Sequence, residues 1–249
     1  MITFKKEKDL EKMRAAGKIM IEVFDLLNNE IKPGVSTKDL DKIVHEYIIS
    51  RGGKPSCLHY GGFPASICTS VDDKIIHGIP REDEILKEGQ IISIDFCVNY
   101  KGFNADAART YPVGKISPEK QRLIDITRQS FFEGIKDIKA GSYVGDISHA
   151  VQKFVEKNGY SVIREFVGHG IGSHIHEDPS IPNYGMAGSG TKLKAGMTIA
   201  IEPMVNMGKK EIIMDGVWDV KTRDGLPAAH YENTVLITEN GVEILTLRG

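Results

Sequence analysis

Two aspartates, Asp95 and Asp106, stand in segments that are typical of the two strands of one hairpin. Residues 91–98 are rich in β-branched and aromatic side chains, and asparagine and glycine punctuate the turn that follows. A loop made of Tyr100 and Lys101 would set Asp95 directly opposite Asp106, where side chains lie roughly 4.5–5.5 Å apart and like charges are destabilising. Two carboxylates in an apolar strand pair need a shared proton or a cation. The pattern therefore indicates a metal site.

The chain also repeats itself once, at an offset of 107 residues. Residues 31–34 align with 138–141, and 87–99 align with 194–206. The identical residues keep this offset over more than sixty positions without a gap. At the same offset Asp95 falls on Glu202. A repeat that occurs only twice predicts two structurally related halves rather than a solenoid.

The symmetry predicts a partner acid for Glu202, and Glu232 is the best candidate. Its spacing is longer than that of the first pair because residues 207–227 form an inserted excursion. Four carboxylates that converge from two halves carry too much negative charge for an apolar interior. Two divalent cations about 3.5–4 Å apart would offset that charge.

A histidine joins these acids. His169 lies between Gly168 and Gly170, and flanking glycines let backbone or ligand approach closely. Carboxylates with one imidazole suit manganese, iron, cobalt or zinc, whereas an all-oxygen site would suit magnesium or calcium. On the residues alone, His77, which follows two isoleucines, is interpreted as structural. Three further histidines near the proposed site are expected to be exposed or supporting residues: His59, His174 and His230.

Hydrophobic periodicity and capping residues predict the elements that position these groups. Helices are expected over 9–30, from Ser36 or Thr37 to 50, from Ser117 to about 138, and over 146–158. Strands are expected over 66–70, 197–205, 211–214 and 233–238, besides the hairpin at 91–113. Each half is thus two helices followed by antiparallel strands, which predicts an α+β fold with helices packed on one face of a shared curved sheet. We expect a single catalytic domain, 1–249, with halves at about 9–113 and 117–249.

Bulk properties exclude several classes of protein. The 249 residues are 41% hydrophobic and 27% charged, with a formal net charge of −2, so composition does not indicate nucleic-acid binding. No apolar stretch approaches the roughly 18–20 residues that span a bilayer, and the first thirty residues lack a signal-peptide core. Three cysteines without a C-x-x-C pair favour reduced thiols in a cytoplasmic protein.

Taken together, these residues resemble the methionine aminopeptidases, specifically the type I, bacterial-like form. The resemblance covers essentially the whole chain, and the order and spacing of its motifs match over about 155 residues. The motifs are His77-Gly78-Ile79-Pro80, Asp95 with Asn104-Ala105-Asp106-Ala107-Ala108-Arg109-Thr110, Gly168-His169-Gly170-Ile171-Gly172, Ile201-Glu202-Pro203 and Tyr231-Glu232-Asn233-Thr234. No helical insert of the type II form and no zinc-binding extension is seen, so the chain is expected to be the catalytic core.

The resemblance implies the pita-bread fold, with two pseudo-symmetric halves, and two divalent metal ions. The implied ligands are Asp95, Asp106, His169, Glu202 and Glu232. Asp106 and Glu232 would bridge the ions, His169 and Glu202 would serve one, and Asp95 the other. Asp72 and Lys74 occupy a stretch where relatives can hold a monovalent cation, and we leave this third ion open.

The resemblance also implies the reaction, which is removal of the N-terminal methionine from nascent polypeptides. Glu202 would be proton acceptor and donor, while His77 and His176 would contact the substrate. The methionine pocket would be lined by Cys57, Tyr60, Phe63, Cys68, Ile175 and Trp218. Phe63 and Ile175 replace the tyrosine and phenylalanine of many relatives, which affects pocket shape. A monomer that associates transiently with the ribosome is expected, with no nucleic-acid specificity and no membrane partner.

Three alternatives remain from the sequence. The first is another pita-bread metallopeptidase, of the Xaa-Pro aminopeptidase or prolidase type, although those usually carry a large N-terminal domain for which this chain lacks room. The second is a non-catalytic pita-bread binding protein, which would have lost ligands that are all present here. The third is a purely structural metal site, which the dual role of Glu202 as ligand and base disfavours.

Overall fold

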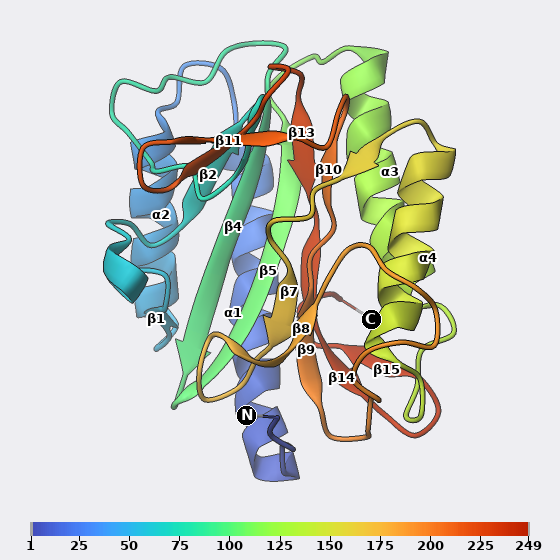
Figure 1. The fold of residues 1–249 in the computed structure, drawn as a ribbon. Helices are drawn as coiled ribbons and strands as arrows, with labels where there is room; N and C mark the ends of the chain where they lie inside the picture. The colour runs from blue at the N-terminus through green and yellow to red at the C-terminus, as the bar shows by residue number, and fades with distance from the viewer. Residues whose placement is uncertain (1, 249) are drawn as a thin grey trace.

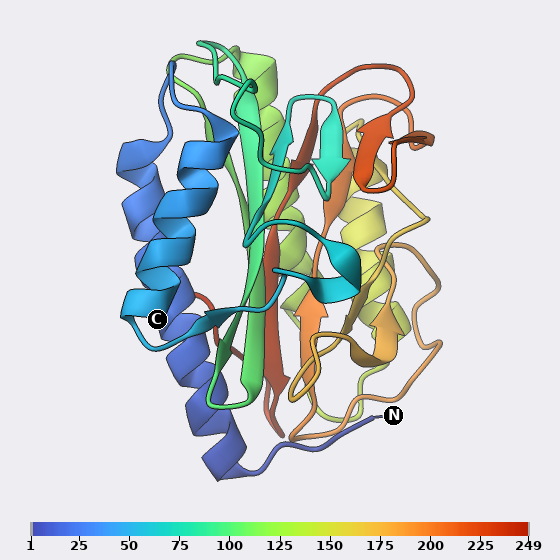
Figure 2. The same cartoon turned by 90° about the vertical axis from the view of Figure 1, so that its left-hand side faces the viewer.

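The computed structural model describes residues 2–248. Within this range, four α-helices cover one face of a large, nine-stranded sheet (Figure 1). The helices are α1 (Glu7–Glu30), α2 (Thr37–Ser50), α3 (Pro118–Ile135) and α4 (Val144–Lys157). Viewed from the side, α1 and α2 lie to the left of the long strands, and the segments around residues 168–181 and 212–222 lie to the right, which is the front of Figure 1 (Figure 2). The front face is therefore the one left open for a site.

The main sheet joins both halves of the chain. Its hydrogen-bonded order is β1 (Lys54–Pro55), β4 (Ile91–Tyr100), β5 (Phe103–Pro112), β14 (Glu232–Ile237), β9 (Thr198–Ile201), β7 (Gly168–Gly170) and β8 (Glu177–Ile181), with β2 (Cys68–Val71) beside β4 and β15 (Val242–Ile244) beside β14. Two three-stranded sheets complete the fold: β13 (Ala228–His230), β10 (Met204–Asn206) and β6 (Ser161–Val162), and then β11 (Ile212–Asp215), β12 (Asp219–Thr222) and β3 (Lys74–Ile76). The β5–β14 pair is the seam at which the halves meet.

The predicted hairpin forms, but its register differs from the prediction. The turn is Lys101-Gly102, with φ of 50° and 90°, and Asn99 Oδ1 accepts a hydrogen bond from Gly102 N at 3.0 Å. Two-residue hairpin turns of this kind need positive φ at both central positions, which glycine adopts without strain and tyrosine does not. Asp95 consequently pairs with Ala108 and Cys97 with Asp106. The two aspartates are diagonal neighbours on one face rather than direct partners.

The two-fold repeat is visible in the backbone. Helices α2 and α4 occupy equivalent positions at the offset of 107 residues, and each contacts the strands of its own half. The bridge between Ser36 and Ile85 has its counterpart between Tyr143 and Lys192. Gly34 N donates to Leu86 O, as Gly141 N donates to Leu193 O. The predicted relation between the halves is therefore confirmed at the level of individual hydrogen bonds.

The helices form where capping and periodicity predict them. The buried side of α1 repeats at helical spacing through Leu10, Met13, Met20, Val23 and Leu27. The Ser117 hydroxyl accepts from Lys120 N at the start of α3, as its Ser-Pro sequence predicts. Helix α3 ends at Ile135, three residues earlier than expected. In the described part of the chain, no helix is both long and apolar enough to cross a membrane.

One predicted strand, 197–205, is broken in the structure. Strand β9 ends at Ile201, and β10 begins at Met204 in another sheet. Pro203 lacks the N–H that would continue the ladder, so the chain leaves the sheet at this point. The break places Glu202 at the end of a strand, where its carbonyl oxygen accepts a hydrogen bond from Asn183 Nδ2 at 2.8 Å.

The other predicted strands, at 66–70, 211–214 and 233–238, agree with β2, β11 and β14 within two residues.

A capping box fixes the start of α2. Ser36 Oγ accepts from Asp39 N at 3.0 Å, and Asp39 Oδ2 accepts from Ser36 N at 3.1 Å. We predict that Ser36→Ala lowers the free energy of unfolding by about 1 kcal/mol, because Asp39 N loses its acceptor and Asp39 Oδ2 loses the hydroxyl that donates to it. For a chain of this size, that corresponds to a decrease in Tm of about 2–4 °C. Ser50→Ala, at the exposed end of the same helix, is the control, and an equal loss there would contradict the assignment.

Candidate metal centre

Strand pairing brings three of the predicted ligands to one face of the sheet. Asp95 pairs with Ala108, and Ala108 pairs with Glu232 across the seam. Directly paired residues project to the same face, as do residues two apart on one strand. Asp106, two residues before Ala108, therefore shares this face. Thr234 fixes it from the other half, because its hydroxyl accepts from Asp106 N at 2.8 Å and donates to Asp106 O at 2.9 Å.

The second half supplies the remaining two predicted ligands. Asn233 on β14 pairs with Ile201, so the next position along β9 places Glu202 beside Glu232. His169 on β7 pairs with Ala200, two residues before Glu202, and so projects to the same side. All five residues predicted as ligands thus converge on one face, around the junction of the two halves.

The contacts of His169 leave one ring nitrogen available to bind a cation. Its Nδ1 lies 2.9 Å from Gly170 O, which leaves Nε2 with a free lone pair. That Nε2 lies 3.7 Å from Asp106 Oδ2 and 3.6 Å from Glu202 Oε1. Burial, with the nearby His176, lowers the pKa of His169 to about 4. The imidazole is therefore neutral near pH 7, as a metal ligand must be.

The glycines that flank His169 allow strands to approach closely. A Cβ added at Gly168 would come within 3.0 Å of Ala200 O, and one at Gly170 would come equally close to Asp178 O. Side chains at these positions would push β7 away from its neighbours. The Gly-His-Gly sequence therefore sets the position of the imidazole relative to the carboxylates.

The site has a large excess of buried negative charge. Burial raises the pKa of Asp106 to about 6, and it raises the pKa values of Asp95, Glu202 and Glu232 well above their usual range, with the other carboxylates adding to the effect. Asp106 Oδ1 and Glu232 Oε1 are buried and have no hydrogen-bond partner among residues 2–248. Divalent cations would satisfy both the charge and these orphaned oxygens, so the donor set fits a metal centre.

Donor atoms fall into two sets that share one residue. Asp106, His169 and Glu232 offer ligand atoms within 4.8 Å of one another, and so do Asp95, His230 and Glu232. Glu202 adjoins the first set through His169. A carboxylate common to two sets is the arrangement expected of a ligand that bridges two ions.

His230 lies buried beside the acids, which agrees with the supporting position expected for it rather than with the exposed one. It is 1% exposed, and its Nε2 lies 3.7 Å from Glu232 Oε2. The available signal was its spacing, because a residue two before Glu232 in extended chain projects to the same side. His59 and His174, by contrast, are exposed as expected.

A cavity of about 210 Å³ opens in front of the carboxylates. All six residues predicted for the methionine pocket line it: Cys57, Tyr60, Phe63, Cys68, Ile175 and Trp218. The sequence reasoning missed three further apolar lining residues: Ile76, Phe166 and Val167. Phe63 meets Trp218 edge-on, with ring centroids 5.3 Å apart, and both belong to one apolar cluster with Cys68. The cavity is therefore apolar at one end and anionic at the other.

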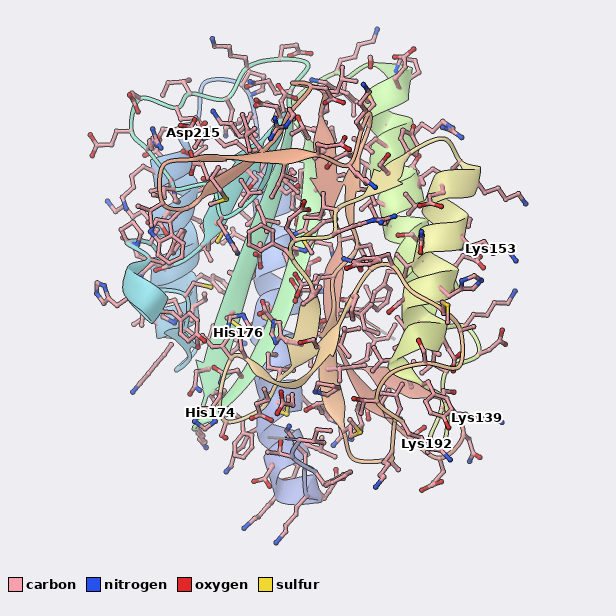
Figure 3. The ribbon with its side chains drawn as sticks, in the orientation of Figure 1. Lys139, Lys153, His174, His176, Lys192 and Asp215 are labelled. Carbon is pink, nitrogen blue, oxygen red and sulfur yellow. The ribbon has the colours of Figure 1, made fainter. Side chains whose placement is uncertain are left out.

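Two more predicted residues, His77 and His176, line the same cavity. His77 has φ of 58°, a left-handed conformation that costs energy in a non-glycine residue, and its ring packs edge-on against Phe166. Such strain is typical of functional positions, and it supports a role beyond packing. His176 stands on the loop before β8, where Figure 3 also labels His174. Its Nδ1 lies 2.7 Å from Tyr60 OH, a contact between the two halves.

A buried ion pair, which was not predicted, holds the loop that carries His176. Lys5 Nζ lies 2.7 Å from Glu177 Oε2, and both side chains are 4% exposed. Thr3 and the backbone N–H of His174 also donate to Glu177. Although burial opposes its ionisation, these donors hold the pKa of Glu177 below its usual range. The N-terminal segment thus fastens the loop that carries His176.

Arg109 supports the seam from behind the ligands. Its guanidinium donates to Glu232 O at 2.5 Å and to Asn233 Oδ1 at 2.6 Å, and it stacks on Tyr231.

The two residues considered for a monovalent cation are Asp72 and Lys74. Asp72 Oδ1 accepts from Lys120 at 2.6 Å, and Lys74 pairs with Glu84. The stretch considered for a third ion is thus engaged in ion pairs.

Comparison with known proteins agrees with this arrangement. The model of metallopeptidase family M24 matches residues 11–239. The methionine aminopeptidase of Clostridium acetobutylicum is 50% identical over 248 residues, which cover 99% of each chain. The crystal structure of methionine aminopeptidase from Thermotoga maritima superimposes with a TM-score of 0.98, at 42% identity over the full length of both chains. The prolidase of Pyrococcus furiosus, at 23% identity and a TM-score of 0.78, covers 99% of this chain and 66% of its own, and shares the fold. The chain is therefore a member of metallopeptidase family M24, with the pita-bread fold of that family.

Proposed function

We propose that this chain is a methionine aminopeptidase that removes the N-terminal methionine of peptides and nascent proteins. The observation that carries the proposal is the joining of two ligand sets through Glu232, at the floor of a cavity with an apolar end. The high identity with methionine aminopeptidases over the full chain supports the substrate class.

The metal centre would be held by Asp95, Asp106, His169, Glu202 and Glu232. Bound divalent ions supply a Lewis acid that lowers the pKa of a water molecule and polarises a carbonyl group. We propose two ions, which these five side chains would hold. Mixed carboxylate and imidazole donors favour cobalt, manganese, iron or zinc.

Glu202 would move the proton. Glu202 follows the last residue of β9, and its carboxylate lies next to His169. Burial raises the pKa of this carboxyl well above the usual range. A carboxylate in this condition accepts a proton from the attacking water readily and can pass it to the leaving amine. The hydrogen bond from Asn183 to its backbone keeps the side chain in place.

His77 and His176 would position the substrate. His176 projects from the second half toward Tyr60 of the first, and its ring centroid lies 4.3 Å from that of His169. It would donate a hydrogen bond to the oxyanion that forms at the scissile carbonyl. His77, held between Phe166 and Trp218, would contact the scissile amide nitrogen or the residue after it.

The apolar end of the cavity would take the methionine side chain. Phe63, Cys68 and Trp218 form a wall that contains sulfur and aromatic rings, both of which interact favourably with a thioether. The carboxylates at the other end would attract the free α-amino group. Together, these two ends select a chain by its first residue and by its unblocked terminus.

The setting of this activity is also part of the proposal. We propose that the chain acts as one catalytic domain, 1–249, in the cytoplasm, as a monomer that meets nascent chains at the ribosome. The formal net charge of −2 gives no general attraction to nucleic acids. An Xaa-Pro aminopeptidase remains the second candidate on fold alone, and substrate preference separates the two.

We predict that the metal-loaded protein releases methionine from Met-Ala-Ser and leaves Pro- and Leu-initiated peptides essentially uncleaved. Liquid chromatography of the products, with Mn²⁺ or Co²⁺ added and then with a chelator, checks both substrate and metal dependence. An N-acetylated Met-Ala-Ser is the matched control, because it lacks the charged amine. Preferential cleavage of peptides with proline at the second position would assign the chain to the alternative activity.

We predict that Glu202→Gln folds and loses at least about a hundredfold in kcat, because an amide cannot take the proton. Single-turnover kinetics, with circular dichroism to check the fold, measure this loss. Asn183→Ala, which removes only the support of Glu202, should lose far less. Near-normal turnover of the Gln variant would eliminate Glu202 as the base.

We predict that the metal-free protein loses a few kcal/mol of stability as pH rises from about 4 to about 6. Asp106 holds a proton in the folded state up to about pH 6, whereas the unfolded state loses it near pH 4. Because the folded state binds more protons in this window, its stability falls with rising pH and stays lower above it.

Urea unfolding with a chelator, between pH 4 and pH 7.5, measures this dependence. Asp106→Asn removes the contribution of that carboxyl and should make the profile less steep, while the other three buried carboxyls keep part of the slope. Saturating Mn²⁺ should reverse the trend, because metal binding requires the deprotonated form. A wild-type profile that matches Asp106→Asn would contradict the prediction.

A further inference from the structure

We propose that His230 is a sixth metal ligand, which binds the ion on the Asp95 side of the centre. The inference rests on the proposed function, since it concerns the second of the two ions. It adds an imidazole to a position where the resemblance to methionine aminopeptidases implied only carboxylates.

The first observation is the geometry. His230 Nε2 lies 3.7 Å from Glu232 Oε2, too far for a hydrogen bond and suitable for two ligands of one ion. Donor atoms of Asp95, His230 and Glu232 all lie within 4.8 Å of one another. Ligand atoms of one ion lie at most about 4.4 Å apart, so the three side chains would close in around a bound cation.

The second observation is that the ring lacks any polar partner. His230 is 1% exposed, and both of its ring nitrogens are buried without a hydrogen bond among the described residues. A buried polar group in this state is destabilising, so a role in packing alone does not account for it. A cation would satisfy Nε2 directly.

The third observation is that the backbone holds the residue in place. Thr110 Oγ1 accepts from His230 N at 2.9 Å and donates to His230 O at 2.9 Å. Thr234 holds the proposed ligand Asp106 in the same way. In both cases, a threonine hydroxyl from a neighbouring strand binds the backbone N–H and C=O of the residue and so fixes its position.

The added donor changes the chemistry of the centre. Without His230, the Asp95 side offers oxygen donors alone, whereas the other side has His169. With it, each ion has one imidazole ligand, which favours transition ions over magnesium on both sides. We therefore expect tighter binding of the second ion than carboxylates alone would give.

The test counts imidazole ligands in the protein loaded with Co²⁺. A histidine bound to paramagnetic Co²⁺ gives an exchangeable N–H resonance far outside the ordinary range. We expect two such resonances in the wild type, from His169 and His230, and one in His230→Gln. His174→Gln, an exposed histidine on the loop before β8, should keep both. One resonance in the wild type would overturn the inference without any need for a variant.

Calorimetric titration with Co²⁺ gives a second, independent readout. In His230→Gln and in His230→Met, affinity for one of the two ions should fall by at least about tenfold, with the other nearly unchanged. Circular dichroism of the metal-free variants checks that they fold. Unchanged binding of both ions would overturn the role of His230 alone, whereas a wild type that binds no divalent ion would overturn the proposed function as well.

Discussion

Repulsion among buried carboxylates is the constraint on which the rest of this structure depends. Asp95, Asp106, Glu202 and Glu232 project from one face of a sheet into a shared space with little access to water, and burial opposes the ionisation of each. A protein selected for stability alone would not place them there. Divalent cations would offset this charge, and the same charge that weakens the metal-free protein would then be the source of metal affinity.

The two halves contribute to this site in an interlocked way. Asn104 of the first half donates to Gly172 O through both its backbone and its side chain, and Tyr60 meets His176 across the cavity. Arg109 joins β5 to the backbone of Glu232. The residues that line the cavity, and the bonds that support them, come from both sides of the seam, so neither half holds the complete cavity. The chemistry is a property of the joined molecule.

Much of the fold was predictable from sequence because its signals are local. The capping residues Ser36 and Ser117, and the helical spacing of apolar residues, placed the four helices closely. The repeat related Asp95 to Glu202 and was correct. The register of the central hairpin was wrong, because the turn at Lys101-Gly102 is selected by backbone conformation rather than by composition. Whether His230 would be exposed or supporting could not be decided from the sequence, because its neighbours in space belong to strands far away in the chain. The strained backbone of His77 has no signature in the sequence at all.

The ladder of hydrogen bonds that joins β4, β5 and β14 carries a broader consequence. Asp95, Ala108 and Glu232 form one row across these strands, and the spacing of that row is the fixed interval between paired backbones. Packing in the hydrophobic layers beneath does not set this interval. Substitutions among apolar core residues therefore leave this interval unchanged as long as the strands stay paired. A relative that shares 42% of its residues with this chain keeps the same fold, with a TM-score of 0.98.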